Sequence, residues 1–199
     1  MERTRLCRIL GEDVDYGDDC FDALDSAAGL QHLQADYAAA RKDADLVLFY
    51  PHVGGQFNTK PGSFSQYIAA RAVEMGFDAV LEAHSHTTQI ARCVGSVPVF
   101  YSLGNVSMTH TVYTVEESLP QYGLAAHLYT DGGRIARTSF SIIKMVQREG
   151  RRMEIWPVDE LLETCPEDRD ALLRETAAVW ARVSGKTPEE FVPAREYAL

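Results

Sequence analysis

Basic side chains are scarce in this chain. Its 199 residues include 19 lysines and arginines against 29 aspartates and glutamates, which gives a formal net charge of −10 and an isoelectric point near 5.0. Nucleic acids are bound by clustered lysine and arginine that neutralise phosphates, so this balance excludes a nucleic-acid partner. It also disfavours an anionic membrane surface. An acidic chain that handles phosphate esters needs metal ions to offset the charge repulsion.

Long apolar runs are missing as well. The longest, ADLVLFY at 44–50 and SVPVFYSLG at 96–104, fall far short of the roughly 20 residues that cross a bilayer. The start, MERTRLCRIL, has no apolar stretch long enough for a signal peptide. As written, the sequence predicts a cytoplasmic protein with no membrane segment in this chain.

Cysteine is rare and scattered. No CxxC pair occurs, so the sequence indicates neither a thiolate zinc site nor a thioredoxin-like motif. An even count permits two disulfides, but free buried thiols fit a chain of this size better. The four positions are Cys7, Cys20, Cys93 and Cys165.

The rest of the composition is that of a soluble globular protein, with 46% hydrophobic and 24% charged residues. The length suits one domain over residues 1–199 with a proper core. Periodicity predicts an α/β core in which helices alternate with short apolar strands. We expect helices at 30–44 and 63–75 and strands at 45–50, 77–83 and 97–103. This succession implies parallel strands whose following loops leave at one edge of the sheet.

After residue 105 the pattern becomes antiparallel. The DGG sequence at 131–133 lies between two apolar stretches and predicts a β-hairpin. Residues 151–158 could add another strand. The remainder, 164–199, indicates a helical tail in which Thr164 and Glu167 have the spacing of a capping box.

Two histidines stand one residue apart in VLEAHSHTTQ, residues 80–89, at the end of a predicted strand. Imidazole is the commonest metal ligand, and imidazoles from separate strand ends are how hydrolases build transition-metal sites. Alternation in an extended segment places both on one side, where they can serve one ion or two neighbouring ions. A single such histidine is more often structural. Three loops share the predicted edge, carrying His52 with Gly54 and Gly55, His84 with His86, and Gly104 with Asn105.

These ordered motifs resemble the CapA-type family of capsule synthesis proteins, also called the poly-γ-glutamate capsule biosynthesis family. The motifs are the strand 45–50, His52 with Gly54, Gly76 with Asp78, His84 with His86, and SLGN at 102–105. The likeness covers roughly residues 35–160 and suggests the C-terminal portion of such a domain. It implies a partial calcineurin-like metallophosphoesterase sandwich, with two sheets packed face to face and helices outside.

The resemblance also implies a metal-dependent, phosphoesterase-like hydrolase that uses a divalent transition metal such as manganese, iron or zinc. Carried over to this chain, His52 and His84 hold one ion and His86 its neighbour, and all three are catalytic. Gly54, Gly55 and Asn105 are then expected at the substrate, with Asn105 shaping its loop. Family members are often exported or membrane-anchored.

The sequence departs from the superfamily pattern in its first part, where the bridging aspartate and the Asn-His motif are absent. DVDYG at 13–17 echoes residues that follow that motif, but it lies too close to His52, and we interpret it as coincidence. The alternative is therefore a non-catalytic, partner-dependent half-domain that acts as a binding or structural subunit.

For either function we expect a homo-oligomer, or a complex with a separately encoded N-terminal half. The contact is expected along bare strand edges at 46–50 and 79–83, with an apolar face that includes Leu46, Leu48, Val80 and Leu81.

Overall fold

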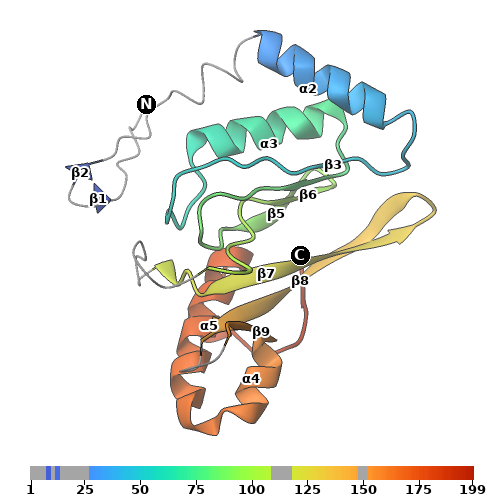
Figure 1. Cartoon of the computed structure of the whole chain (residues 1–199). Coiled ribbons are helices and arrows are strands. Elements are labelled where there is room, and N and C mark those ends of the chain that lie inside the picture. The colour runs from blue at the N-terminus through green and yellow to red at the C-terminus, as the bar shows by residue number, and fades with distance from the viewer. Residues whose placement is uncertain (1–7, 10–11, 14–26, 109–117, 148–151) are drawn as a thin grey trace.

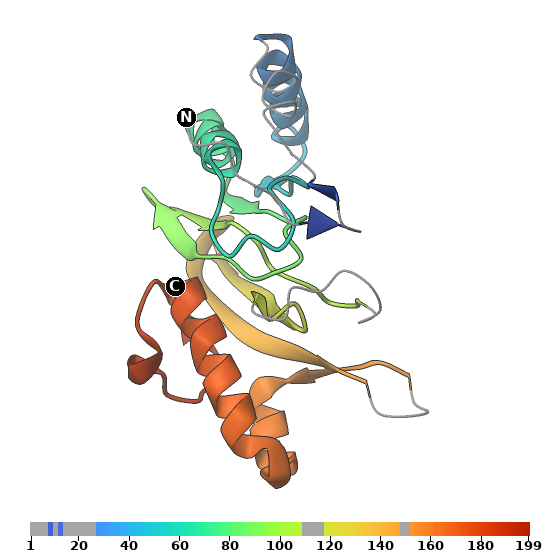
Figure 2. The ribbon, with the colours of Figure 1, turned by 90° about the vertical axis from the view of Figure 1, so that its left-hand side faces the viewer.

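The computed structural model describes residues 8–9, 12–13, 27–108, 118–147 and 152–199. These residues form a layered α/β fold, which confirms the predicted class (Figure 1). Helix α3 (Ser63–Met75) covers one face of a four-stranded mixed sheet, and α2 (Ala27–Ala40) lies next to it. A second sheet lies on the other side, followed by α4 (Val158–Thr164) and α5 (Arg169–Ser184) (Figure 2).

The first sheet contains the predicted parallel core. Its strand order is β3-β4-β6-β5, in which β4 pairs in parallel with both β3 and β6, and β5 is antiparallel to β6. The strands are β3 (Leu48–Phe49), β4 (Ala79–Leu81), β6 (Val97–Phe100) and β5 (Ala91–Val94). Strands β3, β4 and β6 are shorter than the apolar runs that predicted them. The hairpin of β5 with β6 was not predicted from the sequence.

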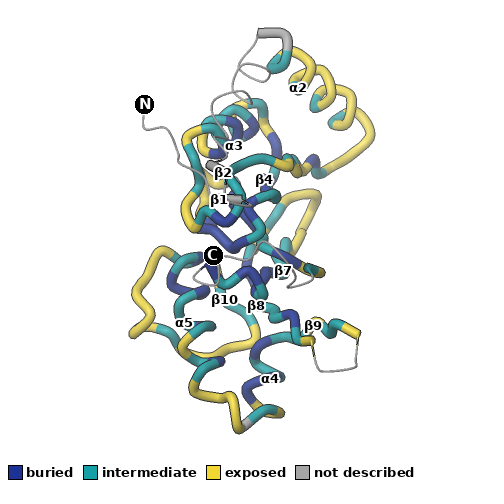
Figure 3. Tube along the Cα trace, turned by 60° about the vertical axis from the view of Figure 1, so that its left-hand side comes forward, coloured by how far each residue is buried: buried dark blue, intermediate teal, exposed yellow. Residues whose placement is uncertain are grey.

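Both faces of this sheet are covered. Val80 and Val99 are fully buried against α3, in a cluster that includes Ala69 and Ala72. Phe100, on the opposite face, packs with residues of the second sheet and α5. Burying an aliphatic side chain of this kind contributes about 1.5–3 kcal/mol. Figure 3 shows these buried segments at the centre of each layer.

This arrangement corrects the expected apolar face. Val80 is fully buried and Leu81 packs against the core, because β4 lies inside the sheet between β3 and β6. Among the described residues β3 is the edge strand on that side, and its Leu48 keeps 44% of its surface exposed. In the part of the chain that the structure describes, the exposed edge on this side is therefore that of β3 and does not include β4.

The second sheet is antiparallel, with the order β10-β8-β7 and β9 also paired to β8. Its strands are β7 (Tyr122–Asp131), β8 (Arg134–Val146), β9 (Glu154–Pro157) and β10 (Tyr197–Ala198). The predicted DGG hairpin is confirmed, because Asp131 pairs with Arg134 and the two residues between them are glycines with positive φ. A separate antiparallel pair is formed by β1 (Arg8–Ile9) and β2 (Glu12–Asp13).

Helix α3 has the predicted bounds, whereas α2 starts three residues and ends four residues earlier than the predicted range 30–44. Gly76 and Gly185 end α3 and α5 in the left-handed conformation. The predicted capping box of Thr164 is wrong: Thr164 ends α4, its hydroxyl donates to the carbonyl of Glu160, and α5 starts five residues later at Arg169. The short 3-10 helices are η2 (Pro166–Asp168) and η3 (Pro188–Glu190).

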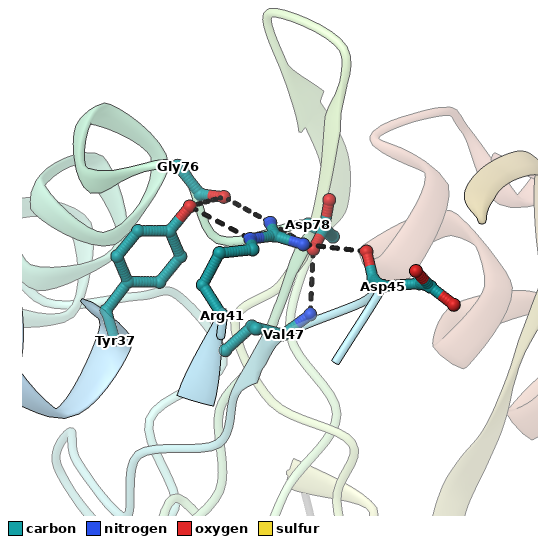
Figure 4. Close-up of polar contacts among 6 residues, drawn as sticks. All are labelled: Tyr37, Arg41, Asp45, Val47, Gly76 and Asp78. Atoms are coloured by element: carbon teal, nitrogen blue, oxygen red, sulfur yellow. Dashed lines mark hydrogen bonds and ion pairs between the residues drawn. The ribbon is translucent and has the colours of Figure 1, made fainter. Parts of the chain in front are cut away.

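A polar network fixes where β3 and β4 begin (Figure 4). Arg41 Nη2 lies 2.6 Å from Asp78 Oδ2, and the same oxygen accepts a hydrogen bond of 2.8 Å from the backbone N–H of Val47. Arg41 also donates to the carbonyls of Asp45 and Gly76. The network therefore links the chain after α2 to the N-terminal ends of both strands.

Among the described residues, no helix is long and apolar enough to span a bilayer.

Candidate functional site

His52 and His84 meet beyond the C-terminal ends of β3 and β4. The pairing of these strands continues past their ends, because the backbone N–H of Val53 donates to the carbonyl of Ala83 and Ala83 donates to Pro51. This pairing holds the two histidines side by side. His84 Nδ1 lies 2.9 Å from His52 Nε2, and the ring centroids are 4.7 Å apart. The proximity expected from the strand ends is confirmed.

His84 and His86 do not follow strand alternation. Their φ angles are 112° and 55°, values that non-glycine residues rarely adopt. The two rings therefore face different partners, with their centroids 6.3 Å apart. Holding a residue in such a conformation costs about 1–3 kcal/mol and persists only where the surroundings enforce it. The extended backbone expected here is therefore wrong, although the two imidazoles remain neighbours.

His86 is oriented by Asn105, which is only 7% exposed. The Asn105 amide nitrogen donates to the carbonyls of His86 and Pro120, at 2.8 Å each, so its carbonyl oxygen must face the ring. That oxygen lies 2.9 Å from His86 Nδ1. An amide oxygen only accepts, so Nδ1 carries the proton. In the neutral ring Nε2 then keeps its lone pair, the arrangement found in metal-bound histidines.

The electrostatics favour a neutral imidazole at His84. Burial lowers the pKa of His84, and positive charge on His52 and His86 lowers this pKa further. A neutral ring has a lone pair to offer to an ion or a proton. His52 is exposed, so the pair is open to solvent.

The carboxyl group closest in sequence to His84 is that of Glu82. This side chain is fully buried, and neither of its oxygens has a hydrogen-bond partner among the described residues. Burial raises the pKa of Glu82 to about 8, and the nearby Ser65 hydroxyl only partly opposes this rise. Nothing in the sequence distinguished this glutamate.

The donors present fit one ion better than two. Among the described residues, no group of three His, Cys, Asp or Glu side chains is arranged to hold a metal ion. His52 and His84 bring two nitrogens together, which supplies part of the four-coordinate shell of a transition ion. In the described part of the chain no carboxylate joins the three imidazoles, so the residues do not fit a paired-metal centre.

The glycines of the site allow close backbone contacts. Gly54 has φ 109°, and a Cβ there would lie 3.1 Å from Ser65 Oγ. At Gly55 a Cβ would lie 2.2 Å from the side chain of Asn58. Gly123, at the start of β7, lies so close to Asn105 that a Cβ would come within 2.1 Å of its carbonyl oxygen. Sequence reasoning missed Gly123, because it lies 18 residues beyond Asn105.

The chain is similar to known capsule proteins. Residues 12–109 match the family model described as "Bacterial capsule synthesis protein PGA_cap". The "PGA biosynthesis protein CapA" of Bacillus subtilis (strain 168) is 29% identical over 105 residues, which are 52% of this chain and 27% of that protein. The "Capsule biosynthesis protein CapA" of Bacillus anthracis is 31% identical over 83 residues, 41% of this chain and 20% of that protein.

The matched segments thus span about a quarter of the length of these relatives. The family match begins at residue 12 and includes DVDYG, which sequence spacing had set aside as coincidence. It ends at residue 109, before the hairpin of β7 with β8 and before α5.

Proposed function

Since this chain belongs, through residues 12–109, to the bacterial capsule synthesis family, we propose that it acts in capsule biosynthesis as a metal-dependent, phosphoesterase-like hydrolase. The polymer we propose is poly-γ-glutamate. The observation that carries the enzymatic part is the His52–His84 pair, two imidazoles 2.9 Å apart at a solvent-open strand end. Its proposed cofactor is one manganese, iron or zinc ion.

His52 and His84 are the residues that would hold this ion. The ion would act there as a Lewis acid and lower the pKa of water, which provides a nucleophile at neutral pH. Burial keeps the pKa of His84 low, so its ring offers a lone pair near neutral pH. The pair can also share and pass on one proton between Nδ1 and Nε2.

His86 has a separate task in this proposal. Its ring is oriented by Asn105, so Nε2 is the atom that remains for a ligand or a proton. We assign the substrate to the loop that carries Gly54 and Gly55, where the Ser65 and Asn58 side chains occupy the positions that a Cβ would take.

The test is titration calorimetry of the purified, metal-free chain with Mn²⁺ and Zn²⁺, followed by a phosphodiesterase assay with added manganese. We expect at most one weakly bound ion per chain, whose binding is lost in His84→Ala. His32→Ala is the matched control, because His32 is an exposed histidine on α2. Two tight sites per chain, or binding unaffected by His84→Ala, would contradict the proposal.

A second candidate is a partner-dependent subunit without catalysis of its own. It is favoured by the position of β3, an edge strand that leads directly to His52 and leaves Leu48 44% and Tyr50 63% exposed. Exposed edges of this kind pair with other chains. The partner we propose is a second copy or a separately encoded N-terminal half. Light scattering tests self-association: a stable monomer at micromolar concentration, unchanged in Tyr50→Lys, would exclude the homo-oligomer.

A further inference from the structure

We propose that Arg182, near the C-terminal end of α5, is a positioning residue for His86 and acts on it through Thr87. Arg182 lies outside the matched segment 12–109. The orientation of the His86 ring is a property of the metal-free protein and does not depend on the proposed function. Only its consequence for ligand binding rests on the proposed function.

The contacts form a short chain of hydrogen bonds from α5 to the histidine. Arg182 Nη1 donates to Thr87 Oγ1 and to the carbonyl of Ser118, at 2.7 Å each. Thr87 Oγ1 donates to the same carbonyl at 2.6 Å. Thr87 is fully buried and directly follows His86 in the chain. Any displacement of Thr87 therefore moves the backbone of His86.

A second set of hydrogen bonds also reaches residues 118–120, a segment that we call the strap. Asn105 donates to the carbonyl of Pro120 while it holds the backbone and the ring of His86. His86 is thus held through two residues that both bind the strap, Asn105 at Pro120 and Arg182 at Ser118. Such bracing is what a residue with φ 55° requires, because the left-handed conformation is unfavourable for histidine.

Arginine suits this place chemically. Burial lowers the pKa of Arg182, but a guanidinium stays charged in proteins. Its hydrogen bonds to neutral oxygens are charge-assisted, and these are about twice as strong as neutral ones. One planar nitrogen satisfies both acceptors at once, which a rotating lysine ammonium reproduces only in part.

The test uses NMR of ring-¹⁵N-labelled histidine in the metal-free protein. Arg182→Met should weaken the preference of His86 for the Nδ1–H tautomer and broaden its signals, while His52 and His84 keep theirs. Thr87→Val removes the hydroxyl that links Arg182 to the backbone beside His86, and it should reproduce the effect with Arg182 still present. Arg182→Lys should retain part of the preference of His86 for the Nδ1–H tautomer. Arg174→Met, at an exposed position of the same helix, is the control.

The selectivity for one histidine separates positioning from general destabilisation. Unchanged His86 signals in both Arg182→Met and Thr87→Val, or equal changes at all three histidines, would overturn the proposal. Calorimetry with Zn²⁺ then separates it from the proposed function. If the wild type binds no ion, the metal function fails while the tautomer measurement still decides the role of Arg182. If it binds one, Arg182→Met should retain the binding at His52 and His84.

Discussion

Asn105 Oδ1 accepts a hydrogen bond of 2.9 Å from His86 Nδ1, and the same side chain donates to two backbone carbonyls. The amide is thus fixed by three contacts rather than by the histidine alone. Carbonyl groups that orient a histidine in this way recur behind metal ligands, where they set which ring nitrogen is available. In this chain the available nitrogen is Nε2.

Asn105→Ala should release His86 and destabilise the fold. The carbonyls of His86 and Pro120 lose their common donor, and leaving such buried groups unpaired costs about 1–3 kcal/mol. Urea denaturation measures this loss, and histidine NMR should show a mixture of ring tautomers. Ser107→Ala, at an exposed position in the same loop, is the control. Equal stability of the two variants would mean that the hydrogen bonds of the Asn105 amide contribute nothing to the free energy of unfolding.

Gly123→Ala should be among the most damaging small substitutions. The added methyl group would lie 2.1 Å from the backbone carbonyl oxygen of Asn105, an atom that cannot rotate away as the end of a flexible side chain could. Overpacking of this kind costs about 1–3 kcal/mol or more. Gly62→Ala is the matched control, because a Cβ there meets nothing within 4 Å and φ is −69°. A wild-type melting temperature for Gly123→Ala would contradict the close approach.

The sequence was sufficient for the order of the parallel strands and α3 and for which histidines meet, but it did not predict β5. The apolar runs located β3, β4 and β6, and parallel pairing then required their following loops to share one edge. The meeting of His52 and His84 follows from that rule alone. The hairpin of β7 with β8 was equally readable, since Gly132 and Gly133 fit a tight turn.

The orientation of individual rings was not predictable. Alternation assumes extended backbone, but His84 and His86 have positive φ, which only the surrounding contacts enforce. Those contacts come from residues distant in sequence, such as Ser118 and Arg182, and no local pattern marks them. Glu82 was overlooked for a similar reason. Its burial depends on its position beside Ser65 of α3 and not on its neighbours in sequence.

The network of Figure 4 should make the start of the first sheet sensitive to charge removal. Asp78→Asn keeps the shape of the side chain but removes the charge that pairs with Arg41, so the melting temperature should fall. Asp78→Ala should lower it further, because Val47 then also loses its acceptor. Circular dichroism melts of both variants test this order. Arg41 and Asp78 are partly exposed, so the loss for Asp78→Asn should shrink in high salt.

Glu82 should make the stability of the metal-free protein depend on pH. Burial raises its pKa from 4.5 to about 8, so the folded state favours the protonated acid. The stabilising contribution is therefore fully present below pH 4.5 and is lost as the pH rises through 8. The slope from one such group is at most about 1.4 kcal/mol per pH unit.

Glu82→Gln removes this titration and should flatten the curve. Urea denaturation with a chelator, between pH 5 and 9, should show the wild type losing stability relative to Glu82→Gln as the pH rises. Above the folded pKa the two curves should run parallel again, because the acid is then ionised in both the folded and the unfolded state. Glu189→Gln, at an exposed position, should follow the wild type throughout. Parallel curves for wild type and Glu82→Gln from pH 5 to 8 would show that the Glu82 carboxyl is hydrated in solution. Its burial beside Ser65 of α3 would then not be what sets its pKa.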